Sequence, residues 1–160
     1  MDSQPHFFFC RYCRSIETKA PIVCCGDKMV EFRWDDSLEI GNQIVDAQHK
    51  ELVDMFANLI TDFYSEKPTY ELEQALNFLD AYTVNHFNTE EQLTQSLQFK
   101  EFEKHKGMHE TLKKTVAELI GKFQREGPSG SLAMELNTKI GDWLLVHIRR
   151  EDAKIKPYLK

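Results

Sequence analysis

The stretch from residue 86 to residue 109 reads HFNTEEQLTQSLQFKEFEKHKGMH and decides how the rest of the chain is interpreted. His86 and Glu90 are four residues apart, and so are His105 and His109. Side chains four residues apart lie one above the other on a helix. Imidazole and carboxylate side chains at this spacing suit iron, zinc or copper better than magnesium or calcium. The stretch therefore predicts two helices that each present a pair of ligands to a transition metal.

Composition sets the broad class of the protein. The chain has 160 residues, 41% of them hydrophobic, enough for one sizeable domain and a small appendage. Its net charge of -6 argues against a nucleic-acid partner, whose phosphates need a basic patch. No apolar run approaches the roughly 20 residues that cross a bilayer, and the acidic start MDSQPHFFFC is unlike a secretory signal. We expect a cytoplasmic protein that binds neither nucleic acid nor membrane.

Residues 1–31 form a separate small module in this interpretation, because they hold all four cysteines and show no helical periodicity. Cys10 and Cys13 make one close pair, and Cys24 and Cys25 are adjacent. Four thiolates in two close pairs can surround one tetrahedral metal ion, which would supply most of the folding free energy of so short a segment. Two disulfides would also fit, although the absence of a signal segment favours a metal. The spacing alone leaves iron and zinc open.

The segments FFFCRYC and IVCCGDKMV resemble desulforedoxin and the amino-terminal domain of desulfoferrodoxin. Those families carry a CxxC pair and an adjacent cysteine pair followed by Gly-x-x-Met. The resemblance implies that Cys10, Cys13, Cys24 and Cys25 bind one iron in a rubredoxin-type, one-electron centre, with zinc as the alternative. It also implies that the small modules pair, so we expect a homodimer.

Residues 32–160 carry an arm and four amphipathic stretches with a helical rhythm of apolar residues. The arm, residues 32–42, has Trp34 and Leu38 as expected packing anchors. Expected helices cover residues 43–65, 70–95, 100–126 and 132–153. A loop around Pro68 and the Gly127-Pro128 pair separate neighbouring helices, and Pro157 is expected to stop the last one. The prediction is an all-α, up-down-up-down four-helix bundle.

Five histidines fall on the apolar stripes of these expected helices. A lone histidine on such a stripe is more often a hydrogen-bonded core residue, but burying five imidazoles and a carboxylate without a partner is too costly for a marginally stable fold. His147 and Asp152 are five residues apart, about 140° on a regular helix, so we expect the helix to be tilted or loosened there. The candidate metal ligands are His49, His86, Glu90, His105, His109, His147 and Asp152.

In this order, the seven residues resemble the ligand pattern of hemerythrin, and the resemblance covers residues 32–158. That family is a four-helix bundle that holds two irons joined by an oxo or hydroxo bridge. The resemblance implies three histidines on one iron, His105, His109 and His147. It implies two histidines on the other, His49 and His86, and two bridging carboxylates, Glu90 and Asp152. The second iron would then keep an open position where dioxygen binds.

Reversible oxygen binding needs a dry pocket, because water and protons promote oxidation of the irons. Apolar residues next to the expected ligands are candidates for its lining, although they also fit a plain core. These residues are Leu52, Phe87, Trp143, Leu144 and Ile148. Glu151, just before Asp152, would make such a pocket less dry if it pointed inward.

Two functions fit the chain. We favour oxygen binding, for storage, delivery or sensing, because histidine-rich ligation resembles that of the reversible binders. In this reading the cysteine-ligated iron keeps the di-iron site reduced. The alternative is an oxidoreductase that resembles rubrerythrin in its division of labour. A rubredoxin-like or flavoprotein donor would then pass electrons through the cysteine-ligated iron to reduce dioxygen, peroxide or nitric oxide.

Overall fold

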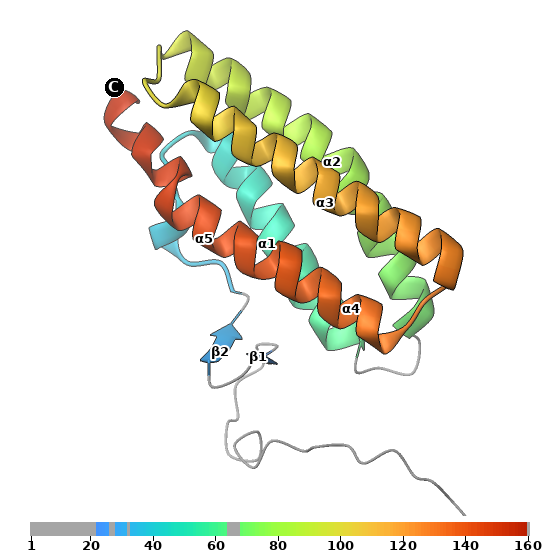
Figure 1. The fold of residues 1–160 in the computed structure, drawn as a ribbon. Helices are drawn as coiled ribbons and strands as arrows, with labels where there is room; N and C mark the ends of the chain where they lie inside the picture. Colours follow the sequence, from blue (N-terminus) through green and yellow to red (C-terminus); the bar gives the residue numbers. More distant parts are fainter. Residues whose placement is uncertain (1–21, 26–27, 32, 64–67, 160) are drawn as a thin grey trace, which may run out of the picture.

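The computed structural model describes residues 22–25, 28–31, 33–63 and 68–159 (Figure 1). The backbone first forms an antiparallel hairpin of β1 (Ile22–Cys25) and β2 (Lys28–Glu31). Its register pairs Cys24 with Met29 and Cys25 with Lys28, so the adjacent cysteines end the first strand. Cys10 and Cys13 lie outside the described residues.

The rest of the described chain is helical, and its long helices lie side by side as four rods, α1, α2, α3 and the combined α4 and α5 (Figure 1). The elements are η1 (Asp36–Leu38), α1 (Gln43–Phe63), α2 (Pro68–Ser96), α3 (Phe102–Glu126), α4 (Gly130–Leu136), the π-helix η2 (Asn137–Gly141), α5 (Asp142–Arg150) and the 3-10 helix η3 (Asp152–Tyr158). Successive rods are joined end to end and alternate in direction. This confirms the predicted four-helix bundle. Within the described ranges, no helix has the length and apolar character needed to cross a membrane.

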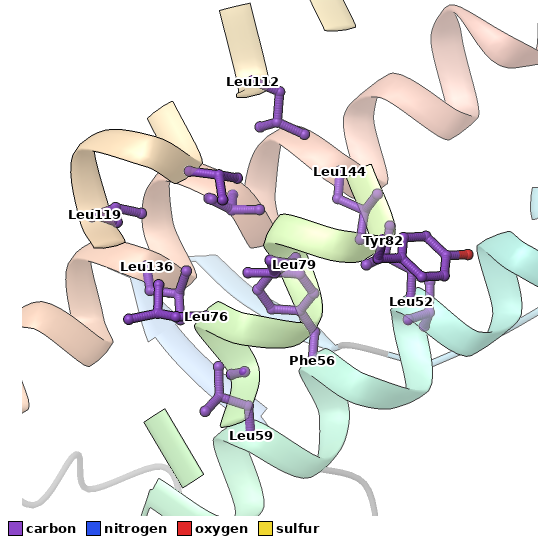
Figure 2. Close-up of a cluster of buried hydrophobic side chains, with 14 of the residues drawn as sticks. Leu52, Phe56, Leu59, Leu76, Leu79, Tyr82, Leu112, Leu119, Leu136 and Leu144 are labelled. Atoms are coloured by element: carbon purple, nitrogen blue, oxygen red, sulfur yellow. The ribbon is translucent and has the colours of Figure 1, made fainter. Parts of the chain in front are cut away.

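Aliphatic side chains from all four rods fill the space between them (Figure 2). Phe56, Leu79 and Leu136 are each completely buried in this main hydrophobic cluster. Leu38 is buried in it too and Trp34 packs against it, as predicted for the arm. A second, smaller cluster joins the arm, α1, the turn between α2 and α3, and η3, through Ile40, Val45, Phe99 and Ile155. The two hydrophobic clusters therefore lie on either side of the buried histidines.

Several helix boundaries differ from the prediction. Pro68 begins α2 instead of lying in a loop, because proline at the first helical position loses no hydrogen bond. Gly127 ends α3 as predicted, with φ of 74° and its N–H donating to the Phe123 carbonyl at 2.8 Å. Ser129 caps α4, so this helix begins two residues before the predicted start. Near the start of α1, Ile44 is 64% exposed, and the fully buried Val45 takes the inward position.

The π-helix η2 interrupts the last rod, where the sequence predicted one regular α-helix. Its defining hydrogen bond runs from the Asp142 N–H to the Asn137 carbonyl, five residues back. The buried positions before and after it recur every four residues, at Leu132, Leu136, Ile140 and Leu144. A four-residue repeat drifts by about 40° per step on an α-helix. One π turn accommodates one additional residue and so cancels this drift. The buried face of the last rod therefore still points inward at His147.

Deleting Lys139, an exposed residue of η2, is therefore expected to leave the bundle folded. The inward spacing changes from 4, 4, 4 to 4, 3, 4, which suits a regular α-helix. The expected loss is about 1 kcal/mol or less, mainly from the ion pair between Lys139 and Glu135. Urea unfolding followed by circular dichroism measures it.

The matched control is deletion of Lys114, exposed on the regular helix α3. That deletion rotates one part of α3 against the other by about 100° and should prevent cooperative folding. Equal damage from the two deletions would contradict the role assigned to η2.

Pro157 does not stop the last rod, contrary to the prediction. The α-helix has already ended at Arg150, and the chain continues as the 3-10 helix η3 through Pro157 to Tyr158. The fixed φ of proline suits a 3-10 helix, and its missing N–H removes only one bond from a short segment. Through η3 the fully buried Ile155 reaches the smaller hydrophobic cluster.

Candidate metal centre

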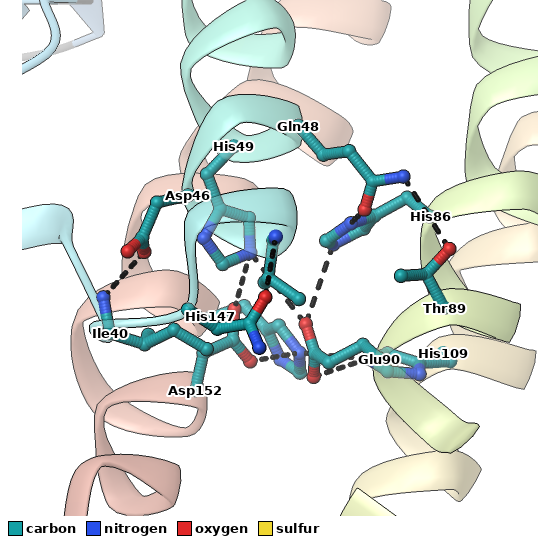
Figure 3. A network of polar contacts seen from close by, with 12 residues as sticks. Ile40, Asp46, Gln48, His49, His86, Thr89, Glu90, His109, His147 and Asp152 are labelled. Carbon is teal, nitrogen blue, oxygen red and sulfur yellow. Dashed lines mark hydrogen bonds and ion pairs between the residues drawn. The ribbon is translucent and has the colours of Figure 1, made fainter. Parts of the chain in front are cut away.

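Seven polar side chains from all four rods converge inside the bundle (Figure 3 labels most of them). None of them is more than 4% exposed. They are His49 from α1, His86 and Glu90 from α2, His105 and His109 from α3, His147 from α5 and Asp152 from η3. The structure thus brings together all seven residues that the sequence analysis singled out in the bundle.

The potential donor atoms fall into two groups that share Glu90. The larger group, which we call the three-histidine group, consists of Glu90, His105, His109, His147 and Asp152. The smaller, the two-histidine group, consists of His49, His86 and Glu90. In each group the donor atoms all lie within 4.8 Å of one another, close enough to surround one metal ion.

Glu90 and Asp152 each present one oxygen to either group. Glu90 Oε1 lies 2.6 Å from His105 Nε2, and its Oε2 lies 3.6 Å from His49 Nε2. Asp152 Oδ1 lies 3.3 Å from His105 Nε2, and its Oδ2 lies 3.2 Å from His49 Nε2. Both carboxylates therefore stand between the two groups, where each can serve two metal ions at once.

The regular α-helix ends between His147 and Asp152. The α-helix α5 ends at Arg150, the Glu151 N–H donates to the His147 carbonyl at 2.7 Å, and η3 begins at Asp152. The Asp152 Oδ1 atom then lies 3.0 Å from His147 Nε2. The predicted departure from a regular helix is thus present at Glu151, and the tighter 3-10 winding begins at Asp152.

The protein alone leaves many of these buried atoms without a hydrogen bond among the described residues. Both ring nitrogens of His49, both carboxylate oxygens of Glu90 and of Asp152, and His105 Nε2 are in this position. Each unsatisfied buried group costs about 1–3 kcal/mol, and more when charged. A cation removes that penalty. The donor set of imidazole nitrogens and carboxylate oxygens suits a transition metal, so the residues fit a pair of such ions.

Burial and charged neighbours shift the pKa values of the histidines in opposite directions. Burial, followed by repulsion from His49, lowers the pKa of His86 to about 4, and burial lowers the pKa of His109 to about 3. Burial also opposes a charge on His49, but the neighbouring carboxylates of Asp152 and Glu90 outweigh it and raise its pKa to about 9.

The carboxyl groups are held in the charged form. Burial and the nearby Asp152 oppose the charge of Glu90, but its contacts with His105 and His49 lower its pKa to about 2. Burial likewise opposes the charge of Asp152, and the imidazoles of His147 and His49 hold its pKa well below the usual range. Neutral imidazole and ionised carboxylate are the forms that bind metal.

Two polar residues that the sequence analysis missed lie behind the histidines. The Nδ1–H of His86 donates to Gln48 Oε1 at 3.1 Å, and the Nδ1–H of His109 donates to Glu91 Oε1 at 3.2 Å. These bonds fix the tautomers so that Nε2 of each ring faces the cluster. No periodicity marks the two residues, and the only cue in the sequence is that each adjoins a predicted ligand.

The predicted pocket residues surround the histidines with apolar surface. Phe87 stacks on His109 with ring centroids 3.9 Å apart, and Trp143 stacks on His147 at 4.1 Å. Leu52, Leu144 and Ile148 are buried in the main hydrophobic cluster. Their role in an oxygen pocket stays a prediction.

Glu151, in contrast, forms ion pairs with two lysines. Its carboxylate lies 2.7 Å from Lys154 Nζ and 3.7 Å from Lys104 Nζ, and its side chain is 21% exposed. The sequence left the direction of Glu151 open, and these ion pairs balance its charge at a partly exposed position.

A family model described as the hemerythrin HHE cation binding domain matches residues 40–159. The chain belongs to the hemerythrin family. A bacteriohemerythrin of Pseudomonas paraeruginosa is 34% identical over 125 residues, which cover 78% of this chain and 79% of that protein. A bacteriohemerythrin of Aquifex aeolicus is 27% identical over 115 residues, covering 72% and 87%. A hemerythrin-like protein of Naegleria gruberi is 30% identical over 128 residues, covering 80% and 93%. The hemerythrin match begins at residue 40, beyond the cysteines.

Proposed function

We propose that this hemerythrin-family chain binds dioxygen at a pair of irons. The observation that carries the proposal is the pair of donor groups joined by Glu90 and Asp152. The three-histidine group would hold one iron and the two-histidine group the other. With one imidazole fewer, the two-histidine group leaves room for a further ligand. When bound, a ferrous pair supplies the electrons with which dioxygen is held reversibly.

The surrounding residues serve this function by excluding water. The ring of Phe87 covers His109 and that of Trp143 covers His147, while Leu52, Leu144 and Ile148 are each at most 3% exposed. In a dry site, water and protons are kept from promoting irreversible oxidation of the irons by dioxygen. The residues of the bundle hold the metal ions in place, and none of them is assigned a catalytic role.

The experiment that tests oxygen binding is metal analysis with visible spectra on protein reduced without oxygen. We expect two irons per chain in the bundle and a new absorption band that appears with oxygen and disappears when oxygen is removed. Phe87→Ala should speed irreversible oxidation by opening the site to water, whereas Phe78→Ala, on the same helix but stacked on Tyr82, should not. A bundle that never holds more than one iron, or an irreversible band, would exclude the function.

An oxidoreductase is the second candidate, and what supports it is the adjacent pair Cys24 and Cys25, which ends strand β1. We propose that they bind one iron with Cys10 and Cys13, with zinc as the alternative metal. This centre would pass single electrons from a rubredoxin-like or flavoprotein donor to the di-iron site, with dioxygen, peroxide or nitric oxide as acceptor. Pairing of the cysteine modules would make the protein a homodimer.

The same preparation separates the two functions. An enzyme consumes the electron donor continuously when an acceptor is present, and Cys24→Ser abolishes that consumption while leaving the oxygen band intact. Zinc in the cysteine site would end the relay, because zinc has no redox chemistry. Light scattering on the metal-loaded protein tests the homodimer.

A further inference from the structure

We propose that Glu91 and Gln48 are positioning residues that make the two metal positions unequal. Glu91 strengthens the three-histidine position, and Gln48 leaves the two-histidine position the weaker one. The inference rests on the proposed function only in taking both donor groups as metal positions. It does not depend on which gas or oxidant the site binds.

Glu91 acts on the three-histidine position through a charge. Its carboxylate accepts the Nδ1–H of His109 at 3.2 Å, at a ring that is fully buried. Hydrogen bonds to a carboxylate are roughly twice as strong as those to a neutral acceptor. The negative charge draws on the Nδ1 proton and makes the Nε2 lone pair of His109 a better donor to a cation. Lys106 Nζ lies 3.8 Å from the other oxygen of Glu91, which holds the carboxylate in place from the solvent side.

Gln48 gives the two-histidine position a weaker support. Its amide oxygen accepts the Nδ1–H of His86 at 3.1 Å, but the amide carries no charge. The amide is held in this orientation, because its nitrogen donates to Thr89 Oγ1 at 3.5 Å (Figure 3). The hydroxyl of Tyr82 also donates to the backbone carbonyl of Gln48. The two-histidine position therefore has a neutral amide, Gln48, behind its histidine, where the three-histidine position has the carboxylate of Glu91.

The second histidine of the weaker position lacks even this support. His49 Nδ1 is buried and has no hydrogen-bond partner among the described residues. One position thus combines three imidazoles with an anion behind one of them. The other combines two imidazoles with a neutral amide behind one and, among the described residues, no hydrogen-bond partner behind the other. We infer that metal fills the three-histidine position first, and that the two-histidine position is the last to fill and the first to empty.

The experiment is a titration of chelator-treated protein with Co²⁺, a metal ion that reports its surroundings through its visible absorption. The two bundle positions should give two binding steps of different affinity, in addition to any cobalt that the cysteines bind. Glu91→Gln should weaken the tighter step by about 10–100-fold and leave the weaker step unchanged, as expected for a partner behind a ligand. Gln48→Glu should strengthen the weaker step by about 10-fold and bring the two steps together.

Two matched controls make the same kinds of substitution at positions away from the site. Glu110→Gln removes a carboxylate next to His109 in the sequence, but Glu110 pairs with Lys113 and its side chain is 48% exposed. Gln43→Glu adds a carboxylate to the exposed start of α1. Both controls should leave the two cobalt steps unchanged. In the iron-loaded protein, Glu91→Gln should also raise the potential of one of the two one-electron steps, an effect that a loss of packing would not confine to one iron.

The outcomes separate this inference from the proposed function. Equal effects of Glu91→Gln on both steps, or no effect of either variant, would overturn the inference, and Gln48→Glu tests it independently if Glu91→Gln fails to fold. A wild-type bundle that binds only one cobalt ion would overturn the inference and the paired-metal function together. Two unequal cobalt steps that respond as expected, in a protein whose iron form never binds oxygen, would support the inference and exclude oxygen binding.

Discussion

Glu90→Gln is expected to remove metal from both positions at once, leaving fewer than one tightly bound iron in the bundle. Glu90 belongs to both donor groups, with one oxygen toward His105 and the other toward His49. Glutamine keeps one oxygen but replaces the other with an amide NH₂, which cannot bind a cation, and it removes a negative charge from a buried site. Changes behind a ligand already weaken metal binding by about 10–100-fold, so loss of a shared ligand should exceed about 100-fold.

Calorimetric titration and metal analysis after dialysis measure this effect. Asp80→Asn is the matched control, because it removes one charge from an exposed position on the same helix and should leave both metals bound. His86→Ala shows the effect of losing a ligand that is not shared. His86 belongs to the two-histidine group alone, so its loss should spare the metal ion in the three-histidine group. If Glu90→Gln kept two tightly bound irons, Glu90 would not be a shared ligand.

Spacing along the sequence was enough to predict the bundle and the convergence of its seven polar residues. Each amphipathic stretch has only one face that the core can accept, so a histidine at an inward position such as His49 or His109 must lie between the rods. Five histidines and Glu90 on four such faces can meet only near the bundle axis. Leu38 and Trp34 were predicted as packing anchors of the arm, and Leu38 lies in the main cluster while Trp34 packs against it.

Features that depend on position in three dimensions escaped this reasoning. The four-residue repeat from Leu132 to Leu144 is compatible with an approximate α-helical stripe, and only the accumulated drift reveals the π turn. Gln48 and Glu91 are ordinary polar residues in the sequence, and their roles follow from rings on neighbouring helices that approach them. The cysteine module could not be judged in this way, because its proposed ligands Cys10 and Cys13 lie outside the described residues.

The metal-free protein is expected to be most stable near pH 6.5 and to lose several kcal/mol of stability on either side. On the acid side, His86 and His109 have folded pKa values of about 4 and about 3, below the ordinary value of 6.5. Below pH 6.5 the unfolded chain therefore binds more protons than the folded one, and stability falls with pH. On the alkaline side, His49 has a folded pKa of about 9, so the stability from its protonated form is complete below pH 6.5 and is lost as the pH rises through 9.

Each pKa unit of difference between the folded and unfolded states corresponds to about 1.4 kcal/mol, and coupling within the cluster reduces the sum. Urea unfolding midpoints of chelator-treated protein between pH 4 and 9.5 measure the fall in stability on the acid side (the acid limb) and on the alkaline side (the alkaline limb). His49→Gln should flatten the alkaline limb and leave the acid limb, which separates the raised pKa from general alkaline unfolding. Bound Zn²⁺ should also abolish the alkaline limb, because a metal ion takes the place of the proton on His49. A metal-free protein whose stability rose between pH 6.5 and 9 would contradict the pairing of His49 with Asp152 and Glu90.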